Sequence, residues 1–149
     1  MVALVDHSVH FYTADSKTGK LEQVHSFQAD FADENPSLNH AALSNDNMLL
    51  ATGGDDKIAR VYQLSKDFKR QEEKLVVRHA EAPVTSVDIS RDLSLLVIGS
   101  KDGNAYVCDI AKKGAVVQKL SFKPSPTQKN MVMRTCMFAR DNSIYTLCT

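Results

Sequence analysis

Short stretches in which apolar and polar residues alternate recur along most of the 149-residue chain, separated by polar turns and by equally short apolar runs. Alternation over four to eight residues is typical of a half-buried β-strand, and a short apolar run is typical of a strand covered on both faces. The expected alternating strands are 40–43, 58–62, 84–89, 105–108 and 134–138, the apolar strands are 49–52, 95–98 and 144–147, and outer strands follow at 75–77 and 116–120.

The segments recur in a fixed order. Residues 44–64 (SNDNMLLATGGDDKIARVYQL) align without a gap with residues 90–110 (SRDLSLLVIGSKDGNAYVCDI), and residues 139–147 continue the series. Short strands repeated every 40 to 50 residues are the signature of a β-propeller. We therefore predict an all-β fold that forms part of one β-propeller with four-stranded antiparallel blades. The expected divisions are a partial blade at 1–33, blades at 34–80 and 81–123, and a partial blade at 124–149.

The repeat also indicates which side chains pack between blades. Residues 5–14 (VDHSVHFYTA) match the later half of the unit, which places Phe11 at the same position as Val61 and Val107. Because these positions alternate with polar ones, we expect all three side chains to lie between neighbouring blades.

The stretch Gly53-Gly54-Asp55-Asp56 raises the question of a metal site, because it presents two adjacent carboxylates. In the repeat, Asp56 falls at the position of Asp102, whereas Asp55 falls at that of Lys101. Only the second carboxylate recurs, at a tight turn where it can accept hydrogen bonds from turn amides. No third ligand lies at a useful spacing, so we interpret Asp56 and Asp102 as structural residues and expect no metal.

The composition argues against several classes of function and cellular location. The eighteen basic and eighteen acidic residues cancel, whereas a protein whose main partner is nucleic acid is usually more basic. Three cysteines without disulfide-framework or zinc spacing favour a reducing compartment, and neither a signal peptide nor an apolar run of about 20 residues is present. The sequence also lacks a phosphate loop and a nucleophile elbow. It therefore indicates a cytosolic protein without a recognisable catalytic site.

Residues 110–130 form the one strongly basic stretch, with five lysines and no acidic residue. A solvated blade edge and a contact patch for an acidic partner or a membrane surface both fit this pattern. The lysines are Lys112, Lys113, Lys119, Lys123 and Lys129.

The segments LLATGGDDKIARVYQL and LLVIGSKDGNAYVCDI resemble WD repeats, and RHAEAPVTSVDIS resembles the histidine segment of that family. The resemblance implies a hydrogen-bonded network of a histidine, a hydroxyl, a turn aspartate and a tryptophan. His79, Ser100 and Asp102 match the first three positions. Cys108 stands at the tryptophan position and cannot supply the indole donor.

A narrower resemblance concerns residues 27–62, in which a Gln28-to-Phe31 segment (QADF) leads through an Asn/Asp turn into LLATGG. This order, followed by RHAEAPVTSVDIS and MRTCMFARD, is similar to the endoplasmic-reticulum exchange factors for the COPII GTPase, the prolactin regulatory element-binding protein family. It implies a guanine-nucleotide exchange factor on the cytosolic face of the endoplasmic reticulum membrane, whose partner is the small GTPase that begins COPII coat assembly.

Two parts of that family's pattern are missing from this sequence. The family's exchange element is a glycine-rich, potassium-binding loop in the first blade, and its membrane helix follows the propeller; the sequence contains neither. We therefore transfer no catalytic residue, expect no cofactor in these residues, and interpret the chain as a fragment of a longer, membrane-anchored protein. The alternative function is a non-catalytic WD-repeat scaffold that binds other proteins.

An arc of about three blades is smaller than a closed propeller, which has typically four to eight. We therefore expect the missing blades in a longer protein, or self-association of the fragment through its two ends. The apolar side chains expected to be exposed are Val9 and Phe11 at one end and Ile144 and Leu147 at the other.

Overall fold

The computed structural model describes residues 2–5, 8–28, 37–122 and 132–148, and no helix in these ranges is long and apolar enough to cross a membrane. Within these described ranges, thirteen strands form four antiparallel sheets of consecutive strands. The first sheet contains β1 (Val2–Val5), β2 (Ser8–Ala14) and β3 (Leu21–Gln28). The second contains β4 (Leu38–Leu43), β5 (Leu49–Gly54), β6 (Ala59–Leu64) and β7 (Gln71–Val77). The third contains β8 (Val84–Ile89), β9 (Leu95–Ser100), β10 (Asn104–Asp109) and β11 (Ala115–Ser121), and the fourth contains β12 (Met133–Phe138) and β13 (Ile144–Cys148).

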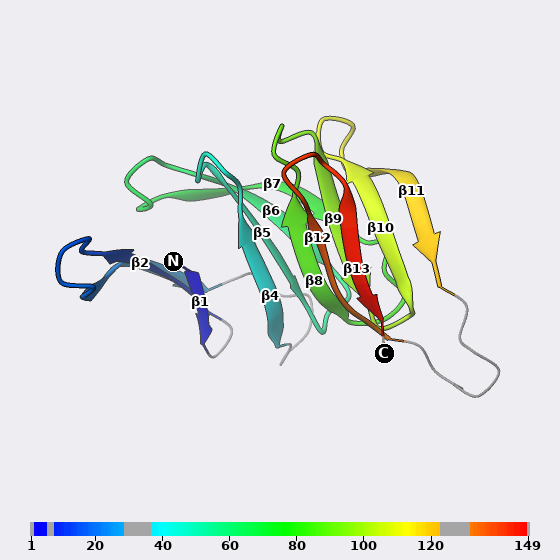
Figure 1. Ribbon diagram of the computed structural model, residues 1–149, viewed down its shortest axis with the longest axis horizontal. Helices are drawn as coiled ribbons and strands as arrows, with labels where there is room; N and C mark the ends of the chain where they lie inside the picture. The colour runs from blue at the N-terminus through cyan, green and yellow to red at the C-terminus, as the bar shows by residue number, and fades with distance from the viewer. Residues whose placement is uncertain (1, 6–7, 29–36, 123–131, 149) are drawn as a thin grey trace.

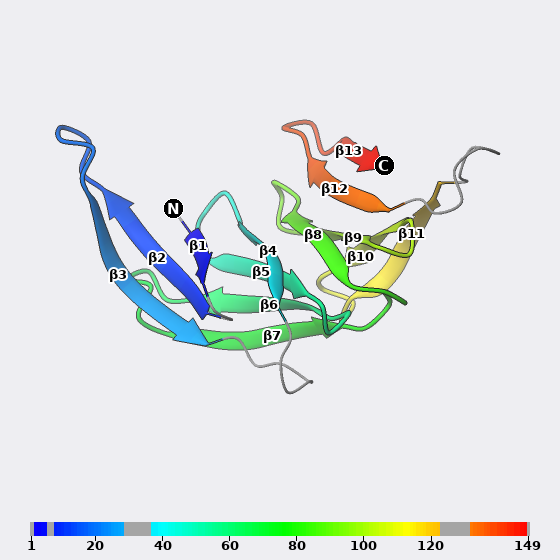
Figure 2. The same ribbon diagram turned by 90° about the horizontal axis from the view of Figure 1, so that it is seen from below.

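The four sheets follow one another around an open arc (Figure 2), with β4, β8 and β12 on its inner side and β3, β7 and β11 on its outer side. Figure 1 shows the same three inner strands next to one another near the middle of the molecule. The predicted fold class is confirmed, because the described residues are all-β and two of the sheets are four-stranded antiparallel blades of a partial β-propeller.

The apolar core lies between successive sheets. In β5, Leu49 and Ala51 face the third sheet, whereas Leu50 faces the first. This division follows from the two-residue period of a strand, which sends neighbouring side chains to opposite faces. The apolar runs expected at 49–52 and 95–98 are therefore buried on both sides, as the sequence predicted.

The three residues that share one repeat position, Phe11, Val61 and Val107, are all buried between sheets, as expected. Val9 and Phe11 were also expected at an exposed end, and that prediction is wrong. Both pack against Leu50 and Leu64 of the second sheet. The alternation of β2 explains the difference, because its apolar positions face the following blade and its polar positions face the open end.

The other end of the arc does expose apolar side chains. Tyr145 and Leu147 of β13 and Met137 of β12 are 62%, 55% and 52% exposed, and Met137 lies directly across from Tyr145 in the sheet. Ile144, which was expected to be exposed, is half-buried and packs against the third sheet. We call Met137, Tyr145 and Leu147 the end patch.

One turn design recurs after four strands. In the turns that begin at Ser44, Ser65 and Ser90, the serine hydroxyl donates a 2.6 Å hydrogen bond to the aspartate two residues later. In all three turns this bond holds the pKa of the aspartate below its ordinary value. The backbone carbonyl of the first residue accepts a hydrogen bond from the residue three positions later, which has positive φ. Those residues are Asn47, Phe68, Leu93 and, in the turn that begins at Ala139, Asn142.

We expect the 149-residue chain on its own to self-associate through the end patch, because exposed apolar faces next to an unpaired strand edge favour association. Multi-angle light scattering during size exclusion should give a mass above the 16.5 kDa of one chain. The double change Tyr145→Thr/Leu147→Thr should shift the population toward the monomer. Leu21→Thr, which alters an exposed apolar residue of β3, is the control and should leave the mass unchanged. A wild-type monomer that melts cooperatively would contradict this expectation.

Candidate protein-interaction site

The inner side of the arc is a wall made of β4, β8 and β12. These three strands belong to different sheets, so their backbones do not form a common ladder. Because a buried peptide group without a partner is unfavourable, peptide groups on such a wall require other hydrogen-bond partners. In this protein, side chains of one strand bond to the backbone of the next.

Strand β8 makes three such bonds to β12. The Thr85 hydroxyl donates to the Met133 carbonyl oxygen at 2.6 Å. The amide of Cys136 donates to Oγ of Ser86 at 2.9 Å, and the amide of Phe138 donates to Oδ2 of Asp88 at 2.7 Å. A carboxylate or hydroxyl acceptor on one blade therefore fixes the position of the neighbouring blade.

Strand β4 is joined to β8 in a similar way. Nδ2 of Asn39 donates to the Val84 carbonyl oxygen at 2.9 Å, and the Val87 amide donates to Nδ1 of His40 at 3.3 Å. The histidine ring nitrogen must be unprotonated to accept this bond. His40 thus serves the wall as a hydrogen-bond acceptor.

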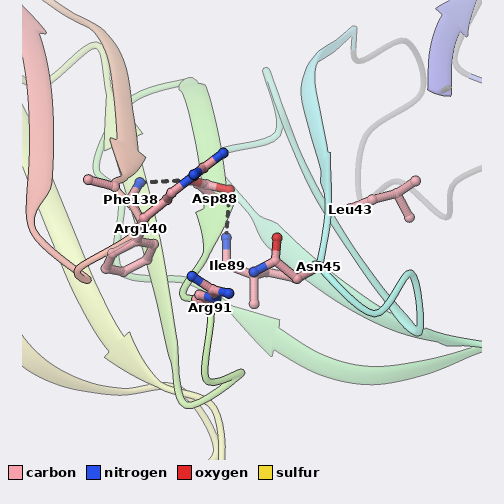
Figure 3. Close-up of a pocket in the computed structure, with 8 residues that line it drawn as sticks. Leu43, Asn45, Asp88, Ile89, Arg91, Phe138 and Arg140 are labelled. Carbon is pink, nitrogen blue, oxygen red and sulfur yellow. Dashed lines mark hydrogen bonds between the residues drawn. The ribbon is translucent and has the colours of Figure 1, made fainter.

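A pocket of about 730 Å³ opens at one end of this wall, where the three inner strands finish (Figure 3). Leu43, Ile89 and Phe138, the last residues of β4, β8 and β12, supply apolar walls. Asn45, Arg91 and Arg140 extend from the turns that follow those strands. The last polar group is Asp88, whose carboxylate already accepts the Ile89 and Phe138 amides.

The pocket offers apolar walls and hydrogen-bonding groups suited to binding. Its two arginines offer hydrogen-bond donors to a ligand, and the carboxylate that lines it is held by backbone amides. The repeat explains its composition, because Asn45, Arg91 and Arg140 occupy the same turn position in three successive units. That shared position is a signal that the sequence interpretation above did not use.

The turn carboxylates lie between β5 and β6 and between β9 and β10. Asp56 is buried and binds Nη1 of Arg60 at 2.7 Å, with the amide of Ile58 as a second donor. Asp55 is exposed, accepts a hydrogen bond from Asn39 at 2.8 Å and lies 3.9 Å from Nζ of Lys101. Within the ranges that the structure describes, no three His, Cys, Asp or Glu side chains are grouped so as to hold a metal ion.

The Asp102 carboxylate accepts hydrogen bonds from four donor groups on three residues: the backbone amides of Glu81 and Asn104, Nδ2 of Asn104 and the Tyr106 hydroxyl. Burial opposes its ionisation, but hydrogen bonds from the Glu81 and Asn104 amides and the Tyr106 hydroxyl outweigh burial and lower its pKa. Burial and the same bond to Asp102 raise the pKa of Tyr106. Sequence reasoning missed Tyr106, although its place four residues after Asp102 parallels that of Arg60 after Asp56.

Of the other residues expected in the network, Ser100 lies next to Asp102, whereas His79 bonds to a different turn. The Asp102 amide donates to Oγ of Ser100 at 3.3 Å, and that hydroxyl donates to the Ala82 carbonyl oxygen at 3.0 Å. His79 is exposed, and its Nε2 lies 3.0 Å from the carbonyl oxygen of Gly114 in the turn before β11. Cys108, at the tryptophan position, is buried, and burial raises its pKa to about 12.

The described lysines of the basic stretch lie on or beside β11. Lys112 pairs with Asp109 at 3.0 Å, Lys113 is exposed, and Nζ of Lys119 lies 5.2 Å from the centre of the Tyr106 ring. Two apolar residues of the same strand, Val116 and Val117, are 41% and 61% exposed. Lys123 and Lys129 lie outside the described residues, so the partner patch remains a prediction.

Replacing Asp56 with alanine should destabilise the fold by about 3–5 kcal/mol, because it leaves Arg60 buried without its closest carboxylate. Asp55→Ala removes an exposed ion pair and should change the stability by less than about 1 kcal/mol. Urea denaturation followed by circular dichroism measures both. The double variant Asp56→Leu/Arg60→Met should recover most of the loss, and equal effects of the two single variants would contradict a buried pair.

Asp102→Asn should lower the stability at neutral pH, because an amide nitrogen then faces backbone donors. The pKa of Asp102 is lowered in the folded state, so its contribution is complete above the ordinary aspartate pKa of about 3.9 and is lost as the pH falls through the lower folded value. The stability difference between wild type and variant should therefore shrink below about pH 4. Denaturation from pH 7 to pH 2 tests this, and a pH-independent difference would contradict it. As a second check, Tyr106→Phe removes one donor and should raise the Asp102 pKa in an NMR titration.

Comparisons with known proteins agree with this geometry. The family described as "WD domain, G-beta repeat" matches residues 21–63 and 72–109, which together exceed half of the chain. No curated protein sequence matches. A chain from "Crystal Structure of Mitotic Checkpoint Complex" is similar in structure, with a TM-score of 0.69 and 14% identity, over 97% of this chain and 40% of that one. This chain therefore spans less than half the length of that neighbour, and the likeness concerns the fold alone. The protein belongs to the WD-repeat family, whose fold is a general scaffold for protein interactions.

Proposed function

We propose that these residues belong to the propeller of a guanine-nucleotide exchange factor for the small GTPase that begins COPII coat assembly. The observation that carries the proposal is the order of segments in the sequence, from QADF at 28–31 through LLATGG at 49–54 to MRTCMFARD at 133–141. Residues 29–31 lie outside the described ranges, so this support comes from the sequence. The same resemblance supports a place on the cytosolic face of the endoplasmic reticulum membrane.

The requirements of nucleotide exchange are compatible with the frame and the exposed turns that the described residues form. An exchange factor binds the GTPase and distorts the loops that hold the nucleotide, so it requires binding energy and rigid loops rather than a catalytic acid or base. The hydrogen-bonded wall holds neighbouring blades in register, and the turns at its end present Arg91 and Arg140 to solvent. A rigid frame with exposed turns is a suitable support for such a binding surface.

The second candidate is a scaffold that binds proteins and has no exchange activity. The pocket at the end of the wall favours it, because a recess with apolar walls and arginines at its rim suits a protein segment. The two functions differ in one measurable property: only the first accelerates nucleotide release.

We expect the longer protein that contains these residues to accelerate release of a fluorescent GDP analogue from the COPII GTPase. Residues 1–149 alone should not, because the glycine-rich loop implied by the resemblance is absent from their sequence. Stopped-flow fluorescence with both proteins makes the comparison, and an unrelated small GTPase is the control.

Failure of the longer protein to accelerate release, with binding to other proteins retained, would replace the exchange function with the scaffold function. Acceleration by residues 1–149 alone would mean that the exchange surface lies within this chain and that the missing loop is not required.

A further inference from the structure

A second hollow, of about 290 Å³, lies between the first and second sheets. Its walls are mainly apolar and include Phe11, Tyr12, Val24, Leu43 and Phe68. We call these five residues the socket. None of them carries a charge, in contrast to the pocket at the end of the inner wall.

Phe68 reaches the socket from a strained backbone conformation. Its φ is +59°, at the turn position that Asn47 and Asn142 occupy elsewhere. Asparagine tolerates left-handed backbone, whereas a bulky residue there is uncommon and the conformation costs about 1–2 kcal/mol. The ring of Phe68 stacks on Phe11 with 5.5 Å between ring centres, so the strained turn holds an aromatic ring against the socket floor.

Val24, at the rim, is an exposed apolar residue. The pairing of β2 with β3 skips Val24, which is therefore the extra residue of a β-bulge and is 40% exposed. The equivalent bulge between β6 and β7 skips Lys74, which is also exposed. The third blade resembles the first, because the pairing of β10 with β11 skips Val117, which is 61% exposed. The bulge residue is therefore apolar in the first and third blades and charged in the second, and the first-blade valine is the one that borders the socket.

The turns around the socket carry a net positive charge. Segments 15–20, 44–47 and 65–70 contain five cationic residues and three carboxylates, although the whole chain is neutral. All three carboxylates accept hydrogen bonds within their own turns. The cations are Lys17, Lys20, Lys66, Lys69 and Arg70, and the carboxylates are Asp15, Asp46 and Asp67.

We propose that the socket docks a short extended segment of a partner protein, which inserts one aromatic or leucine side chain between Phe68 and Val24 and places acidic residues on the surrounding turns. The hollow lies at the lower end of the range of roughly 300–1,000 Å³ typical of ligand pockets, a size that suits one or two anchoring side chains. A recessed anchor ringed by polar and charged groups is a common arrangement in protein recognition. This inference does not depend on the exchange activity.

A membrane surface fits the same features less well. Contact with a bilayer requires apolar side chains that project beyond their surroundings, whereas Phe11 is buried and Phe68 and Leu43 are half-buried within a recess. A protruding side chain of a partner matches a recess, and acidic flanking residues match the excess of lysine and arginine around it.

The test uses the full-length protein that contains these residues and fluorescein-labelled pentapeptides Glu-Glu-X-Glu-Glu, with X as Trp, Leu or Ser. Fluorescence anisotropy should show binding of the Trp and Leu peptides, and binding of the Ser peptide should be at least about tenfold weaker. Binding should weaken as salt rises from 50 to 300 mM, and the Lys-Lys-Trp-Lys-Lys peptide should bind less well than its acidic counterpart.

Two variants test the residues. Phe68→Asn installs the residue found at the same turn position at 47 and 142, so the turn should form while Trp-peptide affinity falls about tenfold or more. Val24→Lys installs the bulge residue of the second blade and should also lower Trp-peptide affinity, and it does so without altering a buried residue. Leu93→Asn, the same type of change in a turn of the third blade, is the matched control and should leave affinity unchanged.

Several results would overturn the proposal. They are absence of Trp-peptide binding, equal binding of the Ser peptide, and full affinity in Val24→Lys or in a folded Phe68→Asn variant. Stronger binding to anionic phospholipid vesicles than to the peptides, lost in the same two variants, would assign the socket to a membrane surface instead.

Discussion

Every blade of this protein depends on its neighbours, because one twisted sheet of four short strands has two apolar faces and no core of its own. β5 shows the constraint directly: Leu50 is covered by the first sheet, and Leu49 and Ala51 are covered by the third. Face-to-face packing therefore places successive sheets side by side along the arc. It also explains the end patch, since β12 and β13 are covered on one face only.

The inner wall is the polar counterpart of this packing. Sheets that fan outward from a common axis bring their first strands together at an angle that does not allow a continuous backbone ladder. Side chains complete the hydrogen bonding instead, with Ser86 and Asp88 accepting amides of the next blade. Gly99 belongs to the same arrangement, because a Cβ at this residue would lie 2.6 Å from Oγ of Ser86 and 2.9 Å from the Met133 side chain.

The strands could be predicted from the sequence because their period is local and is repeated. In each strand, successive side chains point to opposite faces of the sheet with a two-residue period. The same pattern recurs in three copies of the unit, which strengthened the assignment of strands. The orientation of an end strand could not be obtained in that way. Val9 and Phe11 had to face one side or the other, and only the apolar surface offered by Leu50 and Leu64 decides between the two.

The site was less predictable than the fold, for a related reason. The turn carboxylates were recognised from their recurrence, but their partners Arg60 and Tyr106 differ between blades, so the repeat alone did not identify them. The wall pairs residues about 50 positions apart, and that distance is set by how blades stack rather than by any local pattern. The pocket residues Asn45, Arg91 and Arg140 share one turn position, but only the stacking of the blades brings the three turns to one pocket.

In two of the side chain-to-backbone bonds of the wall, β8 supplies the acceptor and β12 the amide donor, and this affects how the protein unfolds. When β8 separates from β12, the amides of Cys136 and Phe138 lose acceptors that their own sheet does not provide. Opening of one blade therefore also exposes peptide groups of the blade that follows it, whose bonds to protein acceptors are then exchanged for bonds to water. Coupling of this kind between nearest neighbours joins short repeats into one cooperative unit. We therefore expect that when one blade frays locally, backbone amides of the next blade become less protected from hydrogen exchange.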